Sequence, residues 1–151
     1  MQDDMHQQIP QPILDIAEKG FAARMGLDLS HFHGLLKQAE EKLRSGNAEA
    51  AFKTFASLLL FEPRNVELQL ALGQSAMAIG HNEIALQAAS VVIALEPDDA
   101  RGWLMSGQAC LAMGEPDLAR EDLTKAATMD ADAPIRASAE RILNAISTND
   151  A

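Results

Sequence analysis

The sequence GNAEAA at residues 46–51 is the first copy of a motif that recurs as GHNEIA at residues 80–85 and GEPDLA at residues 114–119. Each copy begins with glycine and ends with alanine, and the interval from the first copy to the second equals that from the second to the third. Two further pairs keep the same interval: Gly73 with Gly107, and Pro63 with Pro97. Because several small or helix-breaking residues share one period, the sequence predicts a structural repeat.

The recurring residues are those that a helical hairpin needs. Glycine can take the left-handed conformation in which a helix commonly ends, so Gly46, Gly80 and Gly114 are expected to end the first helix of each hairpin. Proline stops the second helix. Small residues, which let two helices approach closely, stand in two facing sets: Ala39, Gly73 and Gly107, and Ala51, Ala85 and Ala119. A helical hairpin of about 34 residues is typical of the tetratricopeptide (TPR) repeat. The fold expected is therefore an all-α TPR solenoid of three helix-turn-helix repeats.

Additional segments are expected on both sides of the repeats. A solenoid needs atypical terminal units, since an end repeat would otherwise expose an apolar face. In the last segment, Ile135, Ala139, Ile142, Leu143 and Ile146 form an apolar stripe, which predicts a capping helix. The expected organisation is a disordered N-terminus (1–9), a leader helix and linker (10–29), repeats at about 30–63, 64–97 and 98–131, a capping helix (132–147) and a disordered tail (148–151).

Composition and charge exclude several classes of function. The chain has 12 basic and 22 acidic residues and a formal net charge of −10. Nucleic acids and anionic membrane surfaces require a basic footprint, so neither is an expected partner. No apolar stretch approaches the ~20 residues that span a bilayer, and the N-terminus does not resemble a signal peptide. The single cysteine, Cys110, excludes an intramolecular disulfide. We expect a soluble intracellular protein whose partners are apolar or basic.

The TPR resemblance implies a concave groove lined by the first helix of each hairpin. In the register of such repeats, its peptide-binding positions are Leu36, Glu40, Leu43, Leu70, Gln74, Met77, Leu104, Gln108 and Leu111, with His33, Glu67 and Arg101 at the rim. A leucine at helical spacing is more often part of a core than of a binding surface. Other apolar residues on these helices already face the hairpin partner, however, so the groove leucines form a second stripe. A peptide groove and a groove filled by the leader helix are both compatible with this pattern.

The sequence contains no arrangement typical of catalysis or metal binding. His31 and His33 are two residues apart and point to different sides of a helix, so they cannot share a metal as an i, i+4 pair can. Paired acids such as Glu40-Glu41 are more simply solvated helix faces, and Asp130-Ala131-Asp132 lacks the glycine and glutamate of a calcium loop. We expect no enzymatic activity, no metal and no cofactor.

The order of these parts resembles the class II chaperones of type III secretion systems, the SycD/LcrH-like family. The resemblance is carried by the leader ILDIAEKG at residues 13–20, the linker GLDLS at 26–30 followed by LLKQAE at 35–40, and the tail PIRASAERILNAI at 134–146. It covers about residues 10–147, and most of its motifs are those of TPR repeats in general.

This resemblance implies a function and partners. Members of the family bind hydrophobic translocator proteins in the bacterial cytoplasm before secretion and keep them soluble. An extended N-terminal segment of the client lies in the groove, and homodimers often form through the leader helix. Because the chain has no tyrosine, its pockets would be purely aliphatic. The alternative is a general TPR adaptor that assembles a complex of folded partners.

Overall fold

The chain folds into a stack of antiparallel helices joined by short turns. The computed structural model describes residues 29–129 and 132–149, so the N-terminal segment 1–9 and nearly all of the leader region 10–29 lie outside the described residues. Within the described part, the regular elements are all α-helices, which agrees with the predicted all-α fold. They are α3 (Leu29–Arg44), α4 (Ala48–Leu59), α5 (Val66–Ala78), α6 (Asn82–Leu95), α7 (Ala100–Ala112), α8 (Pro116–Thr128) and α9 (Ala133–Asn149).

Three glycines end the first helix of each hairpin. Gly46, Gly80 and Gly114 have φ angles of 87°, 79° and 81°, in the left-handed region where other residues are strained. The residue after each glycine donates its N–H to the carbonyl five positions earlier, on Lys42, Ala76 and Cys110, at 2.8 to 3.0 Å. This is the bonding pattern of a Schellman cap, and it confirms the predicted helix ends.

Side chains at the helix starts satisfy free backbone N–H groups. The Asn47 side chain accepts from the N–H of Ala50 at the start of α4, at 3.3 Å, and Asn65 does the same for Leu68 of α5 at 3.1 Å. Helix α8 instead begins with Pro116. Proline lacks a backbone N–H, but in the first turn of a helix that N–H would have no acceptor within the helix, so no hydrogen bond is lost. Asparagine and proline therefore act as start signals for these helices.

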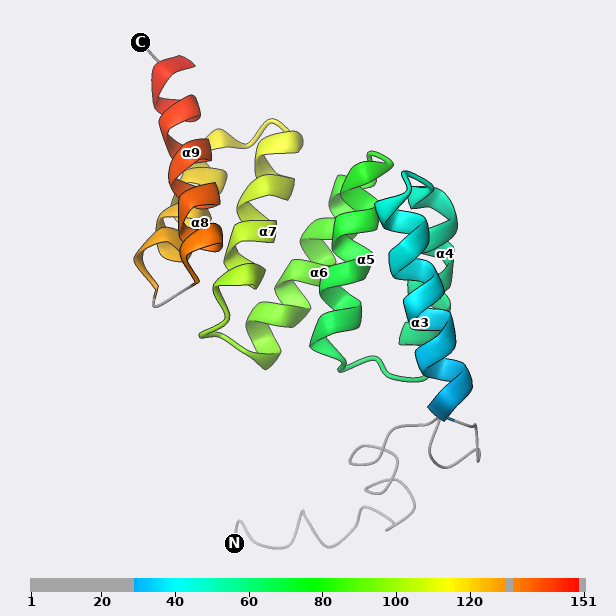
Figure 1. Ribbon diagram of the computed structural model, residues 1–151. Helices are drawn as coiled ribbons and strands as arrows, with labels where there is room; N and C mark the ends of the chain where they lie inside the picture. The colour runs from blue at the N-terminus through cyan, green and yellow to red at the C-terminus, as the bar shows by residue number, and fades with distance from the viewer. Residues whose placement is uncertain (1–28, 130–131, 150–151) are drawn as a thin grey trace, which may run out of the picture.

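The helices are stacked in chain order. Each helix packs against its neighbours along the chain, and α7 also contacts α5 and α9. Figure 1 shows the resulting stack, which runs from the α3–α4 pair at one end to α8 and α9 at the other. The pairs α3–α4, α5–α6 and α7–α8 are the three predicted hairpins.

Small residues lie where helices approach closely. Ala51, Ala85 and Ala119 are all fully buried. A side chain on Gly107 would place its Cβ 2.6 Å from Leu123 and 3.1 Å from the carbonyl oxygen of Ala119, so Gly107 allows the close contact of α7 with α8. Gly73 differs from its expected role within one hairpin. Its Cβ would lie 2.3 Å from the sulfur of Met105, so it makes room for a side chain of the next repeat.

One hydrogen bond is repeated in two hairpins with different donors. The side-chain amide of Gln69 donates to the carbonyl oxygen of Pro63 at 2.9 Å, and the indole N–H of Trp103 donates to that of Pro97 at 3.0 Å. The two donors are one repeat length apart, and so are the two acceptors. Both bonds tie a loop to the first turn of the following helix, α5 or α7.

Helix α9 covers the end of the third repeat. Ala139 and Ile146 are buried against Cys110, Leu123 and Ala126, with Ile142 and Leu143 packed around them. The charged residues Arg136, Glu140 and Arg141 are exposed. The apolar stripe of this helix therefore faces the solenoid, as expected of a cap. The helix continues to Asn149, beyond the predicted end at residue 147.

Candidate functional site

A groove runs along the first helices of the hairpins. Its volume is about 520 Å³. Most of its lining comes from α3, α5 and α7, with one residue each from α4 and α9. The lining residues are Leu36, Glu40, Leu43, Arg44, Phe55, Glu67, Leu70, Ala71, Gln74, Met77, Arg101, Leu104, Met105, Gln108 and Ile135.

Ten of the twelve residues expected at the groove lie in this lining. The exceptions are His33 and Leu111, which do not contribute to it. His33 is exposed, with its ring against the edge of Phe32, and Leu111 is exposed two residues before the cap of α7. The structure thus brings together the other expected positions from all three repeats.

Burial divides the lining into a floor and walls. Leu70 is only 6% exposed and packs into the core with Val92 and Met105, so it belongs to the floor. The alternative reading of a core leucine therefore holds at this position. Leu36, Leu43, Met77 and Leu104 are half-buried and keep part of their side chains open, whereas Glu40 and Gln74 are exposed. The groove consequently offers apolar surface at its base and polar groups above it.

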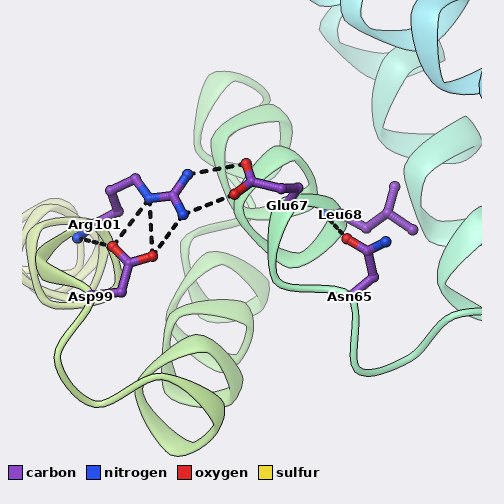
Figure 2. A network of polar contacts seen from close by, with 5 residues as sticks. All are labelled: Asn65, Glu67, Leu68, Asp99 and Arg101. Atoms are coloured by element: carbon purple, nitrogen blue, oxygen red, sulfur yellow. Dashed lines mark hydrogen bonds and ion pairs between the residues drawn. The ribbon is translucent and has the colours of Figure 1, made fainter. Parts of the chain in front are cut away.

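The rim is crossed by an ion-pair network that links the second and third repeats (Figure 2). The guanidinium of Arg101 donates to both carboxylate oxygens of Asp99, at 2.7 to 3.1 Å, and to Glu67 at 3.0 Å. Asp99 also accepts from the backbone N–H of Arg101 and so caps α7. Asp99 therefore fixes the start of α7, and Arg101 joins this start to α5.

The network shifts the ionisation of its members. Burial alone would raise the pKa of Asp99, but hydrogen bonds from the side chain and backbone of Arg101 lower that pKa overall. The hydrogen bonds that Arg101 donates to Asp99 and Glu67, in that order of effect, raise the pKa of Arg101 further above its usual range. Both groups are thus charged at neutral pH, and each nitrogen of the Arg101 guanidinium contacts a carboxylate of the protein.

Five lining residues did not emerge from the sequence. They are Arg44, Phe55, Ala71, Met105 and Ile135. Ile135 has a signal that could have found it, because it lies one repeat length after Arg101 and α9 continues the repeat register as an extra first helix. Phe55 and Met105 are buried core residues whose surfaces reach the groove floor. Residue spacing alone does not reveal that kind of exposure.

Catalysis and membrane insertion would depend on potential metal ligands, the cysteine thiol and long apolar helices among the described residues. In residues 29–129 and 132–149, no group of three or more His, Cys, Asp or Glu side chains could hold a metal ion. Burial, and secondarily the charge of Asp122, raises the pKa of the Cys110 thiol, which disfavours the reactive thiolate. No helix in this part of the chain is long and apolar enough to cross a bilayer.

Sequence comparison finds no match, whereas structural comparison finds several. No protein-family model matches the chain, and no curated protein matches it either. The translocator chaperone SycD of Yersinia enterocolitica aligns over 83% of this chain and 96% of its own, with a TM-score of 0.76 and 21% identity. A type III secretion complex from Aeromonas hydrophila aligns over 93% and 98%, with a TM-score of 0.80 and 18% identity.

The chain has the fold of the type III secretion translocator chaperones. PcrH of Pseudomonas aeruginosa shares it as well, with a TM-score of 0.73 and 22% identity over 80% of this chain and 95% of its own. Members of this fold have been crystallised with their clients: SycD with a peptide of the translocator YopD, and PcrH with the chaperone-binding regions of PopD and PopB. The first TPR domain of Spaghetti, bound to an HSP90 peptide, has the same helical architecture at a TM-score of 0.68 and 16% identity, over 76% of this chain and 89% of its own.

Proposed function

We propose that the chain is a chaperone that binds an extended apolar segment of a hydrophobic type III secretion translocator. The segment lies in the concave groove, and binding keeps the client soluble in the bacterial cytoplasm before secretion. The observation that carries this proposal is the open groove itself, with half-buried aliphatic side chains from three successive repeats. The fold shared with SycD and PcrH, both crystallised with translocator segments, supports it.

The lining suits an extended peptide. Gln74 and Gln108 each carry an amide that can donate to and accept from a peptide backbone. The apolar surfaces of Leu36, Leu43 and Met77 line the same groove and can take spaced apolar side chains of the client. Such a division, with the backbone held by polar groups and specificity supplied by pockets, is common in peptide recognition.

The test is a bulky substitution at an exposed wall position. Gln74→Trp would fill the groove without opening the core, because residue 74 is exposed. Gln87→Trp is the matched control, since Gln87 lies on α6 and does not line the groove. Each variant is co-expressed with a type III secretion translocator from the same genome, and the client that co-purifies is quantified. We expect Gln74→Trp to lose most of the client and Gln87→Trp to retain it; equal retention by both would contradict groove binding.

Leu70 is unsuitable for this test. Its side chain is almost completely buried, so a charge at this position would unfold the second repeat and remove binding for the wrong reason. A substitution at an exposed residue of the groove wall can block the groove without unfolding the protein, so a loss of binding can then be assigned to the groove. Circular dichroism of both tryptophan variants provides the check that the helices remain.

A homodimer through the leader helix is the second part of the proposal. Residues 10–29 contain the apolar set Ile13, Leu14 and Ile16, and SycD has been crystallised in an alternative dimer form. Ile13→Asp in the full chain is expected to lower the mass measured by light scattering from dimer to monomer. Gln8→Asp, which introduces the same side chain ahead of the leader, is expected to leave the mass unchanged. A wild-type chain that is monomeric at micromolar concentration would contradict the dimer.

A general TPR adaptor is the competing function. The Spaghetti TPR domain, which binds an HSP90 peptide, supports this reading because it shares the helical architecture. An adaptor would bind its partner in the partner's folded state. Co-purification of a folded, protease-resistant partner that is unaffected by Gln74→Trp would favour it over the chaperone.

A further inference from the structure

One repeat position places a polar side chain in the groove in every hairpin. These residues are Glu40, Gln74 and Gln108, which are separated by one repeat length each and all line the groove. A glutamine amide both donates and accepts, whereas an ionised carboxylate only accepts. The first member of the row, Glu40, therefore differs from the two glutamines, because a ligand that displaces water from its carboxylate must offer a hydrogen-bond donor in return.

Glu40 has no such donor within the described part of the protein. Its side chain is exposed in the groove wall between Leu36 and Leu43, and no described residue forms a hydrogen bond or an ion pair with its carboxylate. Two cations lie one turn away along α3. Lys37, three residues earlier, forms no ion pair with Glu40, and the guanidinium of Arg44, four residues later, is bound to Glu41. The carboxylate of Glu40 is thus available to a ligand.

The other charges of the lining are already matched. Arg101 is shared between Asp99 and Glu67, and Arg44 is taken by Glu41. Two guanidiniums therefore face four carboxylates when Glu40 is included, so the groove and its immediate partners carry an excess of negative charge. The formal charge of the whole chain, −10, has the same sign and attracts cations towards the groove.

We infer that the segment bound in the groove carries a lysine or arginine side chain that pairs with Glu40. This inference rests on the proposed function and specifies the client: a basic residue stands next to the apolar side chain that contacts Leu36 and Leu43. A cation is the donor that makes the strongest hydrogen bond to a carboxylate. An acidic residue at the same place would be repelled.

The expected contribution is modest because the site is open to solvent. An exposed ion pair changes an equilibrium by about two- to fivefold, and screening by salt reduces it further. Glu40→Gln should therefore weaken binding of a basic peptide about two- to fivefold and make its affinity less dependent on salt. Reversal of the charge, by Glu40→Lys, should invert the preference for peptide charge.

The experiment is a selection of random short peptides displayed on phage, with the purified full chain as bait. Four baits are used in parallel: the wild type, Glu40→Lys, Glu121→Lys and Gln74→Trp. Glu121 is exposed on α8 outside the groove, so Glu121→Lys introduces the same change in net charge at another place. Enriched peptides are synthesised, and their affinities are measured by fluorescence anisotropy at low and high salt.

We expect the wild type and Glu121→Lys to enrich Lys or Arg at one fixed position beside an apolar residue. Glu40→Lys should enrich Asp or Glu at that position instead. If peptides bind and are lost with Gln74→Trp, but the preference is the same for Glu40→Lys and the wild type, the pairing is wrong and the proposed groove function stands. If no enriched peptide depends on Gln74, the groove function fails and the inference fails with it.

Discussion

At the scale of single residues, glycines at one repeat position have different neighbours. Gly73 and Gly107 occupy the same place in successive repeats, yet the first makes room for Met105 of the next repeat and the second for Leu123 of its own hairpin. Gly34, on the exposed side of α3, has no atom within 4 Å of the place where its Cβ would stand. The three positions should therefore respond differently to the same substitution.

The first prediction compares two glycine-to-alanine changes. Gly107→Ala forces a Cβ against Leu123 and the Ala119 carbonyl, so it should lower the free energy of unfolding by about 1–3 kcal/mol. Gly34→Ala adds a better helix former in open space and should raise that free energy by about 0.5–1 kcal/mol. Urea denaturation followed by circular dichroism measures both. Equal effects would show that α7 and α8 are not packed as closely as described.

Residue identity predicted backbone conformation better than it predicted side-chain neighbours. The three turn glycines could be assigned from their spacing alone, because only a left-handed cap needs glycine at that place. The depth of Leu70 could not, because it depends on Val92 and Met105, which come from other helices. Spacing along one helix reports the face on which a side chain lies, and it carries no information about what covers that face.

At the scale of helices, α7 begins with the most extensive polar contact among the described residues. Asp99 caps the helix and also accepts from the side chain of Arg101. Its side chain is 13% exposed, and that of Arg101 is 39% exposed. The start of α7 is therefore fixed both by a backbone cap and by an ion pair, and the two contributions can be separated.

The second prediction separates them by pH. Asparagine also caps helices, so Asp99→Asn keeps the cap and removes the ion pair. Because folding lowers the pKa of Asp99, the ion pair stabilises the protein above the ordinary value of 3.8 and is lost as pH falls through the lower folded value. The free energy of unfolding of the wild type should exceed that of the variant by about 0.5–1 kcal/mol at pH 7. This difference should shrink below pH 3.8.

Denaturation curves at pH 7 and pH 3 measure this difference. Asp98→Asn is the control, because Asp98 is exposed beside the cap. Asp98→Asn should change the free energy of unfolding only slightly, and this change should not show the pH dependence expected for Asp99→Asn. A difference for Asp99→Asn that grew on acidification would contradict the direction of the pKa shift.

At the scale of the whole molecule, most contacts of the solenoid join helices that follow one another along the chain. Helix α9 touches α8 and α7, and the α3–α4 hairpin lies at the other end of the stack (Figure 1). Stability in such arrays is approximately a sum of local and nearest-neighbour contributions. Damage at one end should therefore remain near that end.

The third prediction places that damage at the cap. Ile146→Ala removes a buried side chain that packs beside Cys110 and Leu123, and it should cost about 2–4 kcal/mol. Hydrogen exchange with mass spectrometry should show faster exchange in α7, α8 and α9 and little change in α3 and α4. Glu140→Ala, at an exposed position of α9, is the control. Uniformly faster exchange along the chain would show that the array unfolds as one unit.

The overall architecture was predictable because a repeat multiplies weak signals. One glycine or one proline says little, but three copies at one interval define the hairpins and the concave face. The end of the groove was less predictable. Ile135 lines it because α9 continues the register past the third repeat, and Leu111 leaves it although the register places it there. The last hairpin is followed by the single helix α9 and not by another hairpin, so its surroundings differ from those of the earlier repeats.

The paired hydrogen bonds of Gln69 and Trp103 have a consequence for how such chains diverge. Both bonds require only an N–H at one point in space, and an amide or an indole supplies it equally well. Selection that acts on the position of a donor atom leaves the residue type free to drift. Two copies within this chain already illustrate that freedom.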